Sequence, residues 1–264
     1  MSYCRFQHRN VSRYGLIENM RGDATITRTL SRVPHSFADF EQGDKAEIPL
    51  SVVRLLAPVE PSKIVCVGRN YREHAKELNH PIPTEPLFFL KPPSSVIGAG
   101  DEIRRPNALS HRVDYEGELG VVIGKRCYRL AENDDVRPYI LGYTCVNDIT
   151  ARDLQEKDGQ WTRAKGFDTF CPVGPVVAEG LDPWNGVRVQ SRVNGQVRQD
   201  GTTVDFLFPL ELLIQFISQV MTLESGDLIA TGTPAGVGPL QPGDTVEVTV
   251  EGVGMLTNSV VNID

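Results

Sequence analysis

The sequence lacks the features that mark several large classes of protein. No apolar run approaches the roughly 18 residues of a membrane-spanning helix, and the first five residues do not form the apolar core of a secretion signal. Basic residues are in deficit, since 27 Lys and Arg stand against 34 Asp and Glu for a formal charge of −7. An acidic surface attracts neither nucleic acid nor an anionic membrane. We therefore expect a cytoplasmic protein with no nucleic-acid and no membrane partner.

Cysteines are few and follow no metal-binding or disulfide pattern. The five cysteines are an odd number without CxxC or His-paired spacing, which argues against a disulfide framework and against a zinc site. They are expected to be reduced and mostly buried. The sequence also lacks the GKS or GKT element of a P-loop, so a nucleotide site of that type is not expected.

The 264 residues are enough for a sizeable core, and 40% hydrophobic with 23% charged residues is an ordinary globular composition. Residues 1–58 carry short alternating runs separated by Asn, Gly and Asp, which predict a small β-rich module. A proline-marked boundary at 57–61 follows. We expect a second, larger domain over residues 59–264, with no internal repeats.

Residues 114–124 contain a Glu-x-Glu pattern and end in a β-branched apolar run, which predicts a strand. Side chains alternate along a strand, so Glu116 and Glu118 lie on one face. Two carboxylates this close raise each other's pKa unless a cation lies between them, and a hard divalent cation such as Mg²⁺ suits carboxylate oxygens. A solvated face with two incidental acids is the alternative, and from these residues alone it is the more frequent case. The opposite face carries an apolar series: Tyr115, Leu119, Val121 and Ile123.

A short helix is predicted over residues 69–79, after a buried strand at 63–68. His74 and Glu77 are three residues apart and share a face of this helix, so the carboxylate can orient the imidazole. Such a pair can act as a general base on water. An ordinary exposed i,i+3 pair is the alternative reading of the same residues.

Three further places carry polar groups at the ends of predicted elements. A strand over residues 140–146 is followed by Asp148, a position at which functional carboxylates are often presented. Thr150 and Asp153 have the spacing of a capping box for the next helix. Lys165 lies in a glycine-flanked loop and, as a lone lysine, is expected in solvent. The loop at 231–238 offers threonine hydroxyls and approachable backbone amides, a plausible nest for a carboxylate.

Five blocks of the sequence stand in an order that resembles the fumarylacetoacetate hydrolase family, over roughly residues 60 to 264. The blocks are VGRNY (67–71) with His74, FLKP (89–92), EGE (116–118), DITARD (148–153) and TGTP (231–234). Within the family the chain is most similar to the acylpyruvate hydrolase and oxaloacetate decarboxylase branch. That closer likeness is carried by GRNY (68–71), TARD (150–153), WT with AK (161–165) and CPV (171–173).

The resemblance implies a mainly β (α+β) fold, with a rolled mixed β-sheet catalytic domain and a small β-rich N-terminal module, usually as a homodimer. It also implies site residues. The metal ligands would be Glu116, Glu118 and Asp148, holding Mg²⁺ or Mn²⁺. The catalytic residues would be Lys165 and the dyad of His74 and Glu77, on a helix that in relatives orders over the ligand. Gln155 and Thr233 match positions near the substrate, and Arg69 of the first block joins them as a substrate-binding candidate.

The predicted function is metal-dependent cleavage of a small 2-oxo acid through a pyruvate enolate, by acylpyruvate hydrolysis or oxaloacetate decarboxylation. In this scheme His74 and Glu77 activate water, and Lys165 stabilises the enolate. One alternative is an isomerase of a 2-hydroxy-dienedioate such as 2-hydroxyhepta-2,4-diene-1,7-dioate, because some bacterial members with a similar leading module have that activity. A second alternative is a non-catalytic cation-binding protein, which would have no use for a base, its orienting carboxylate and an adjacent lysine.

Overall fold

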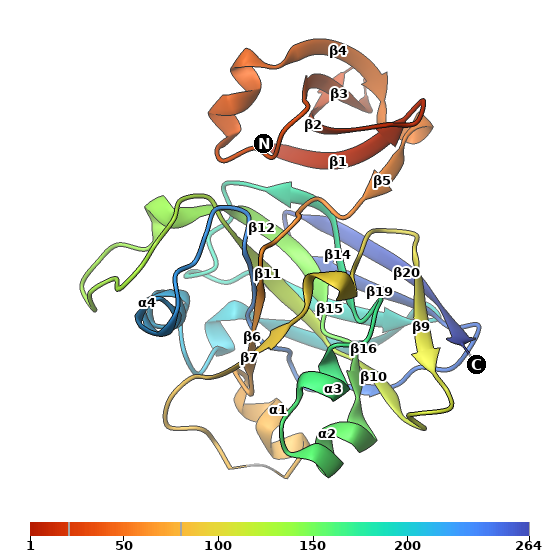
Figure 1. Cartoon of the computed structure of the whole chain (residues 1–264), viewed down its shortest axis with the longest axis vertical. Coiled ribbons are helices and arrows are strands. Elements are labelled where there is room, and N and C mark those ends of the chain that lie inside the picture. The colour runs from red at the N-terminus through yellow and green to blue at the C-terminus, as the bar shows by residue number, and fades with distance from the viewer. Residues whose placement is uncertain (21, 80, 264) are drawn as a thin grey trace.

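A computed structural model of the chain describes residues 1–20, 22–79 and 81–263. Strands predominate and form three sheets, with short helices at their edges (Figure 1). This confirms the mainly β fold with mixed sheets that the sequence predicted. No helix among the described residues combines the length and the apolar character needed to cross a lipid bilayer.

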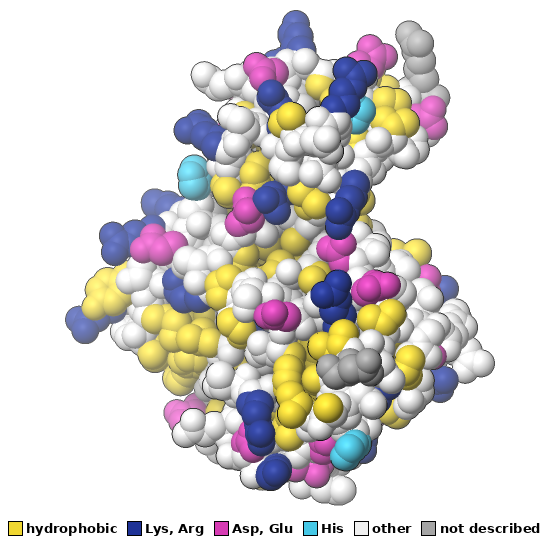
Figure 2. Space-filling model, turned by 45° about the vertical axis from the view of Figure 1, so that its right-hand side comes forward, with side chains coloured by type: hydrophobic (Ala, Val, Ile, Leu, Met, Phe, Trp, Pro, Cys, Tyr) yellow, Lys and Arg dark blue, Asp and Glu magenta, His cyan; other side chains and the backbone are white. Residues whose placement is uncertain are grey.

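The N-terminal strands form a smaller body at one end of the molecule, above the larger one in Figure 1. These strands are β1 (Ser2–His8), β2 (Val11–Met20), β3 (Asp23–Leu30), β4 (Asp44–Pro49) and β5 (Arg54–Leu56). They belong to the twelve-stranded main sheet. The smaller body is joined to the larger one by a short antiparallel pairing of β1 with β14, in which Ser2 lies opposite Ala178 and Tyr3 opposite Val177. Figure 2 shows basic and acidic side chains interspersed over both bodies on this face.

The main sheet continues into the larger body in the order β14, β12, β11, β17, β6 and β7. Pairing is antiparallel except between β17 and β6, so the sheet is mixed. A further short strand, β8 (Val96–Ile97), pairs with β14. The bounds are β6 (Ile64–Gly68), β7 (Leu87–Lys91), β11 (Gly117–Ile123), β12 (Ile140–Asn147), β14 (Cys171–Ala178) and β17 (Leu228–Ala230).

Two smaller sheets complete the larger body, one of five strands and one of three. The hairpin between β15 and β16 turns at Asn194 and Gly195 with φ values of 51° and 76°, both in the left-handed region that an Asn-Gly turn requires. The five-stranded sheet runs β16 (Gln196–Thr202), β15 (Arg188–Val193), β19 (Thr245–Val250), β20 (Gly254–Ile263) and β9 (Glu102–Pro106). The three-stranded sheet runs β13 (Thr150–Ala151), β10 (Val113–Tyr115) and β18 (Gly238–Pro239).

The helices are short, and most lie beside the sheets rather than within the core. They are α1 (Arg72–Glu77), α2 (Arg152–Asp158), α3 (Thr162–Lys165) and α4 (Leu210–Val220). Of these four helices only α4, which follows Pro209, presents a continuous buried face, through Leu213, Ile214 and Ile217.

The main sheet and the five-stranded sheet pack face to face around the largest core cluster. Leu119, Val121 and Ile123 of β11 contribute one side of it, and Val189 and Val248 contribute the other. The two sheets lie close together beside Gly117. A Cβ at this position would lie 2.1 Å from Ser191 Oγ, so only glycine fits between the two glutamates. The packing of the sheets therefore explains the middle residue of the Glu-Gly-Glu pattern.

Candidate metal and active site

The backbone breaks at Glu116, between β10 and β11. The Glu116 N–H donates to Asn147 Oδ1 (3.0 Å), and the Gly117 N–H donates to Gln199 Oε1 (2.9 Å), so side chains take the place of ladder partners here. The prediction of one strand over 114–124 is wrong at this point. As a consequence Tyr115 packs in a different cluster from Leu119, Val121 and Ile123.

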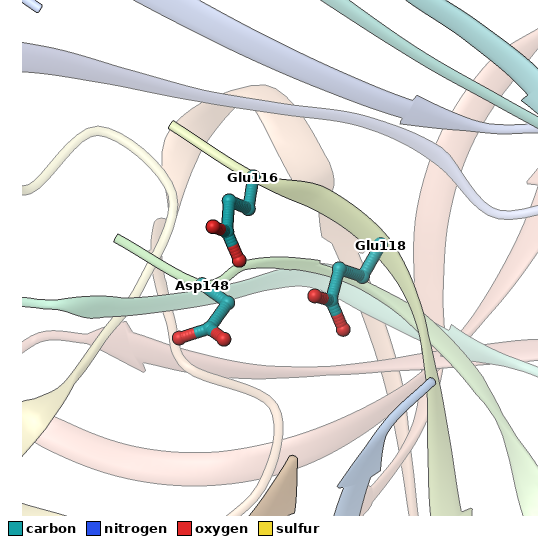
Figure 3. A group of neighbouring side chains, drawn as sticks. All are labelled: Glu116, Glu118 and Asp148. Atoms are coloured by element: carbon teal, nitrogen blue, oxygen red, sulfur yellow. The ribbon is translucent and has the colours of Figure 1, made fainter. Parts of the chain in front are cut away.

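Three carboxylates converge at this break. One oxygen each from Glu116, Glu118 and Asp148 lies within 4.8 Å of the others, and Figure 3 shows the groups gathered beside the strands. Asp148 follows the last residue of β12, and its N–H donates to the Glu116 carbonyl (2.8 Å). The three residues are only 5%, 1% and 1% exposed. A solvated face with incidental acids is therefore excluded.

Two buried lysines meet these acids. Lys165 Nζ donates to Glu116 Oε2 (2.8 Å) and to Asp148 Oδ2 (2.6 Å). Lys91 Nζ donates to Asp148 Oδ1 (2.6 Å) and to the Ile149 carbonyl (3.1 Å). The expectation of a solvent-exposed Lys165 in a loop is wrong, because residues 162–165 form a helical turn that directs its ammonium group inward to the two carboxylates.

A buried arginine supports the same cluster from α2. Arg152 donates to Glu116 Oε1, to Asp114 Oδ2 (3.0 Å) and to Gln155 Oε1 (2.6 Å). Sequence reasoning missed Arg152 and Lys91. Their positions in the sequence were the available signal. Lys91 ends β7 and Arg152 directly follows β13, and a cation buried at such a position requires an acidic partner.

The charges of this cluster are unevenly matched. Burial opposes ionisation of Glu116, but Lys165 and Arg152 outweigh it and hold its pKa far below the ordinary value. Burial likewise disfavours the charged form of Lys165, yet Asp148 and Glu116 raise its pKa to about 12. Glu118 contacts no cationic side chain among the described residues, and burial together with Asp148 and Glu116 raises its pKa well above the ordinary value. A hard divalent cation suits these three oxygens, because it would offset the burial and the repulsion that raise the pKa of Glu118.

The His74–Glu77 pair lies on α1, and Glu77 is held by a hydrogen bond from the loop at 231–238. His74 Nδ1 is 3.2 Å from Glu77 Oε2, and His74 is only 4% exposed although Glu77 is exposed, so the histidine is not part of an ordinary exposed pair. Glu77 Oε1 accepts from the Gly236 N–H (3.0 Å). Burial alone would raise the pKa of Glu77, but the hydrogen bonds from His74 and Gly236 outweigh it and lower the pKa. This docking on Gly236 orients the imidazole.

Backbone amides of the loop at 231–238 bind carboxylates of the protein's own side chains, Glu118 as well as Glu77. The Gly232 N–H donates to Glu118 Oε2 (2.8 Å). The Thr233 hydroxyl donates to the Gly117 carbonyl (2.8 Å) and accepts from Gln199 Nε2 (2.7 Å). The structure thus places Thr233 beside Gly117, at the start of β11, with its hydroxyl engaged by protein groups.

The other two substrate-binding candidates lie together elsewhere. Arg69 and Gln155 both line a cavity of about 670 Å³ that opens between β7 and the α2–α3 segment. Thr233 is not among its lining residues. The structure therefore groups Arg69 with Gln155, and Thr233 with the carboxylates.

The predicted capping box is wrong. The Thr150 hydroxyl donates to the Asp148 carbonyl (2.9 Å), and Ala151 rather than Thr150 precedes α2. The Asp153 carboxylate accepts from the Ser110 hydroxyl and the His111 N–H. Both groups of the expected box are engaged by other partners, because Thr150 is held in the three-stranded sheet.

Comparison with known families covers almost the whole chain. The model of the fumarylacetoacetate (FAA) hydrolase C-terminal family matches residues 63–261. A second model, for the Rv2993c-like N-terminal family, matches residues 1–58.

Named relatives span most of the chain. It is 44% identical to oxaloacetate tautomerase YisK of Bacillus subtilis, over 81% of this chain and 76% of that protein. It is also 44% identical to a mitochondrial oxaloacetate tautomerase of Homo sapiens, over 81% and 71%. The X-ray structure of 5-carboxymethyl-2-hydroxymuconate delta-isomerase from Mycobacterium smegmatis aligns with a TM-score of 0.89 at 43% identity, covering 100% of both chains. The likeness read from the five sequence blocks is thereby confirmed, and the chain belongs to the fumarylacetoacetate hydrolase family.

Proposed function

We propose that the protein is a metal-dependent enzyme that moves a proton on the enol or enolate form of a small 2-oxo acid. The observation that carries the proposal is the convergence of three buried carboxylates, two of which, Glu116 and Asp148, accept hydrogen bonds from the buried Lys165. Glu116, Glu118 and Asp148 would hold Mg²⁺ or Mn²⁺, which prefer oxygen ligands. When bound, the cation supplies Lewis-acid polarisation of the 2-oxo group.

The residues of the chain supply the proton chemistry. His74 Nδ1 is engaged by Glu77, so Nε2 is the atom that would take a proton from the carbon next to the 2-oxo group and return it. Lys165 keeps its proton at neutral pH, because its pKa is raised to about 12. Its ammonium group would stabilise negative charge as that charge develops on the substrate oxygen.

Keto–enol tautomerisation of a 2-oxo dicarboxylate is the reaction we propose first. Two relatives at 44% identity are named oxaloacetate tautomerases, and a similar structure is that of a delta-isomerase. Tautomerisation and isomerisation both need one base and one stabilised enolate, which the dyad and Lys165 would provide. Oxaloacetate is the smallest substrate of this kind.

Carbon–carbon cleavage is the second candidate, and the His74–Glu77 contact favours it. A histidine oriented by a carboxylate can activate water for attack on the distal carbonyl of an acylpyruvate. Decarboxylation of oxaloacetate would also give the pyruvate enolate, but without attack by water. The three reactions differ in products: hydrolysis of an acylpyruvate releases a carboxylic acid and pyruvate, decarboxylation of oxaloacetate releases carbon dioxide and pyruvate, and tautomerisation releases nothing.

The deciding experiment gives the purified protein oxaloacetate and acylpyruvates with Mg²⁺, Mn²⁺ or a chelator. Enol absorbance and deuterium uptake at C3 report tautomerisation, and pyruvate release reports cleavage. Lys165→Met should lower turnover about 10²-fold or more while metal content changes little. Full turnover in protein that elemental analysis shows to be metal-free would contradict the proposal.

A further inference from the structure

Tyr115 makes a hydrogen bond that the proposed chemistry does not use. Its hydroxyl donates to the Gly236 carbonyl (2.8 Å), in the loop at 231–238. The side chain is 3% exposed and packs in the same cluster as Ile149 and Phe170. An ordinary phenol keeps its proton at neutral pH, so the hydroxyl is a donor here. This bond ties β10, the strand that ends directly before Glu116, to the loop.

The same loop residue, Gly236, also holds Glu77. Its N–H donates to Glu77 Oε1 (3.0 Å), and Glu77 Oε2 lies 3.2 Å from His74 Nδ1. Both polar backbone groups of Gly236 are thus used, the carbonyl by Tyr115 and the N–H by Glu77. Successive contacts therefore run from the Tyr115 hydroxyl to the imidazole of His74.

Glycine at positions 236 and 238 lets the tyrosine reach the loop backbone. The φ of Gly236 is 107°, in the left-handed region, and a Cβ there would overlap the Arg198 carbonyl oxygen, so a larger residue does not fit. Gly238 lies opposite Tyr115 in the three-stranded sheet, and a Cβ on it would lie 3.3 Å from the Tyr115 hydroxyl. The loop backbone is therefore held tightly between β16 and the tyrosine.

The dyad depends on such support, because its helix is short and Glu77 is exposed. Helix α1 spans six residues, fewer than two turns. Water competes for the oxygens of an exposed carboxylate, so a hydrogen bond to it keeps its geometry only where the donor is fixed in place. The Gly236 N–H is such a donor, since the Tyr115 hydroxyl binds the other polar group of the same residue.

Glu77 in turn determines which nitrogen of His74 carries the proton. Burial would raise the pKa of Glu77, but the hydrogen bonds from His74 and Gly236 lower it, so the carboxylate is ionised at neutral pH and can only accept. His74 Nδ1 is then the donor of the neutral imidazole, and Nε2 is left without a proton. A base needs that unprotonated nitrogen. Loss of the Glu77 contact would let the proton move to Nε2.

We propose that Tyr115 is a positioning residue for the His74–Glu77 dyad and acts through both polar groups of Gly236. Tyr115 directly precedes Glu116, so one short segment carries a candidate metal ligand and the support of the base. The Tyr115 hydroxyl thereby keeps His74 Nε2 in a fixed position relative to the carboxylates. This inference deepens the proposed function and rests on it for the role of His74 as the base.

Tyr115→Phe tests the role, because it removes the hydroxyl and keeps the ring. The kcat for deuterium exchange at C3 of oxaloacetate in Mg²⁺ should fall roughly 3- to 10-fold, the effect of one neutral hydrogen bond, with little change in KM. The chain has five histidines, and the ¹⁵N spectrum of His74→Gln identifies the His74 signals. At slightly alkaline pH, where imidazoles are neutral, these signals should show the Nδ1-protonated tautomer in the wild type and more of the Nε2-protonated tautomer in Tyr115→Phe.

Two further variants complete the comparison. Tyr14→Phe removes a tyrosine hydroxyl that donates to Glu60 (2.7 Å) near the N-terminal strands, so it should change neither the turnover nor the tautomer. Gly238→Ala keeps Tyr115 but places a Cβ 3.3 Å from its hydroxyl, so it should shift both readouts in the same direction as Tyr115→Phe, by a smaller amount. Gly238→Ala decides the question if Tyr115→Phe does not fold.

The tautomer is measured without turnover, so the outcomes separate this inference from the proposed function. An unchanged tautomer in folded Tyr115→Phe, or unchanged exchange of an acid that the wild type exchanges, would overturn the positioning role. Equal losses in Tyr14→Phe would do the same. If the wild type exchanges no 2-oxo acid but the tautomer still depends on the Tyr115 hydroxyl, the proposed reaction fails and the positioning of the dyad stands.

Discussion

Lys91 and Lys165 both neutralise Asp148, and replacing them by methionine singly and together measures how that charge is balanced. The substitution keeps the approximate side-chain volume and removes the ammonium group. Breaking a buried ion pair by removing one partner typically costs about 3–5 kcal/mol in free energy of unfolding. Each single variant leaves Asp148 with one lysine, at 2.6 Å in either case. We therefore expect each to lose about 3 kcal/mol or less.

The double variant leaves Asp148 without either lysine, so its loss should exceed the sum of the single losses. Coupling between residues that share a partner is commonly about 0.5–3 kcal/mol, and we expect a value in this range. Mg²⁺ should restore much of the loss, because a ligand at 100 times its Kd stabilises the folded state by about 2.7 kcal/mol. Urea unfolding of the four proteins, with and without Mg²⁺, measures both quantities. Additive losses that Mg²⁺ does not change would refute the shared-charge reasoning and the metal assignment together.

Three other predictions concern His74, Glu77 and two buried cysteines. His74→Ala should lower deuterium exchange at C3 of oxaloacetate by about 10²–10⁴-fold without changing Mg²⁺ affinity in calorimetry, and an equal loss of Mg²⁺ affinity would contradict the role of His74 as a base. The Glu77 pKa is lowered, so its contribution to stability is present at neutral pH and is lost as the pH falls below its ordinary value of about 4.3. The difference in free energy of unfolding between wild type and Glu77→Gln, measured in urea, should thus shrink towards acid pH. A difference independent of pH would contradict the lowered pKa of Glu77. Burial raises the pKa values of Cys145 and Cys171 to about 12, so an aromatic disulfide reagent should not label these thiols before unfolding, and rapid labelling of the native protein would contradict that burial.

The local patterns predicted most elements, because those patterns reflect local physics. Strand alternation placed Glu116 and Glu118 on one side, and the apolar run placed Asp148 at the end of its strand. The break at Glu116 could not be predicted, since the groups that replace its ladder partners are Asn147 and Gln199, which lie far along the chain.

Ion pairs between residues far apart in the chain could not be predicted from the sequence either. Lys91 follows an apolar run in the sequence, and only the packing of β7 beside Asp148 shows why a lysine is buried there. The same limit explains the capping-box error, because Thr150 and Asp153 have the right spacing but found other partners. Spacing identifies which side chains could meet, whereas the fold decides which do.

The cations around the carboxylates have a consequence for how the protein matures. Three acids with oxygens within 4.8 Å of one another would repel one another in a newly made protein that has not yet met an ion. Lys91, Lys165 and Arg152 supply positive charge within the chain itself, so the acids can assemble during folding. Folding would then not depend on a metal ion, and an ion would bind to a protein that has already folded.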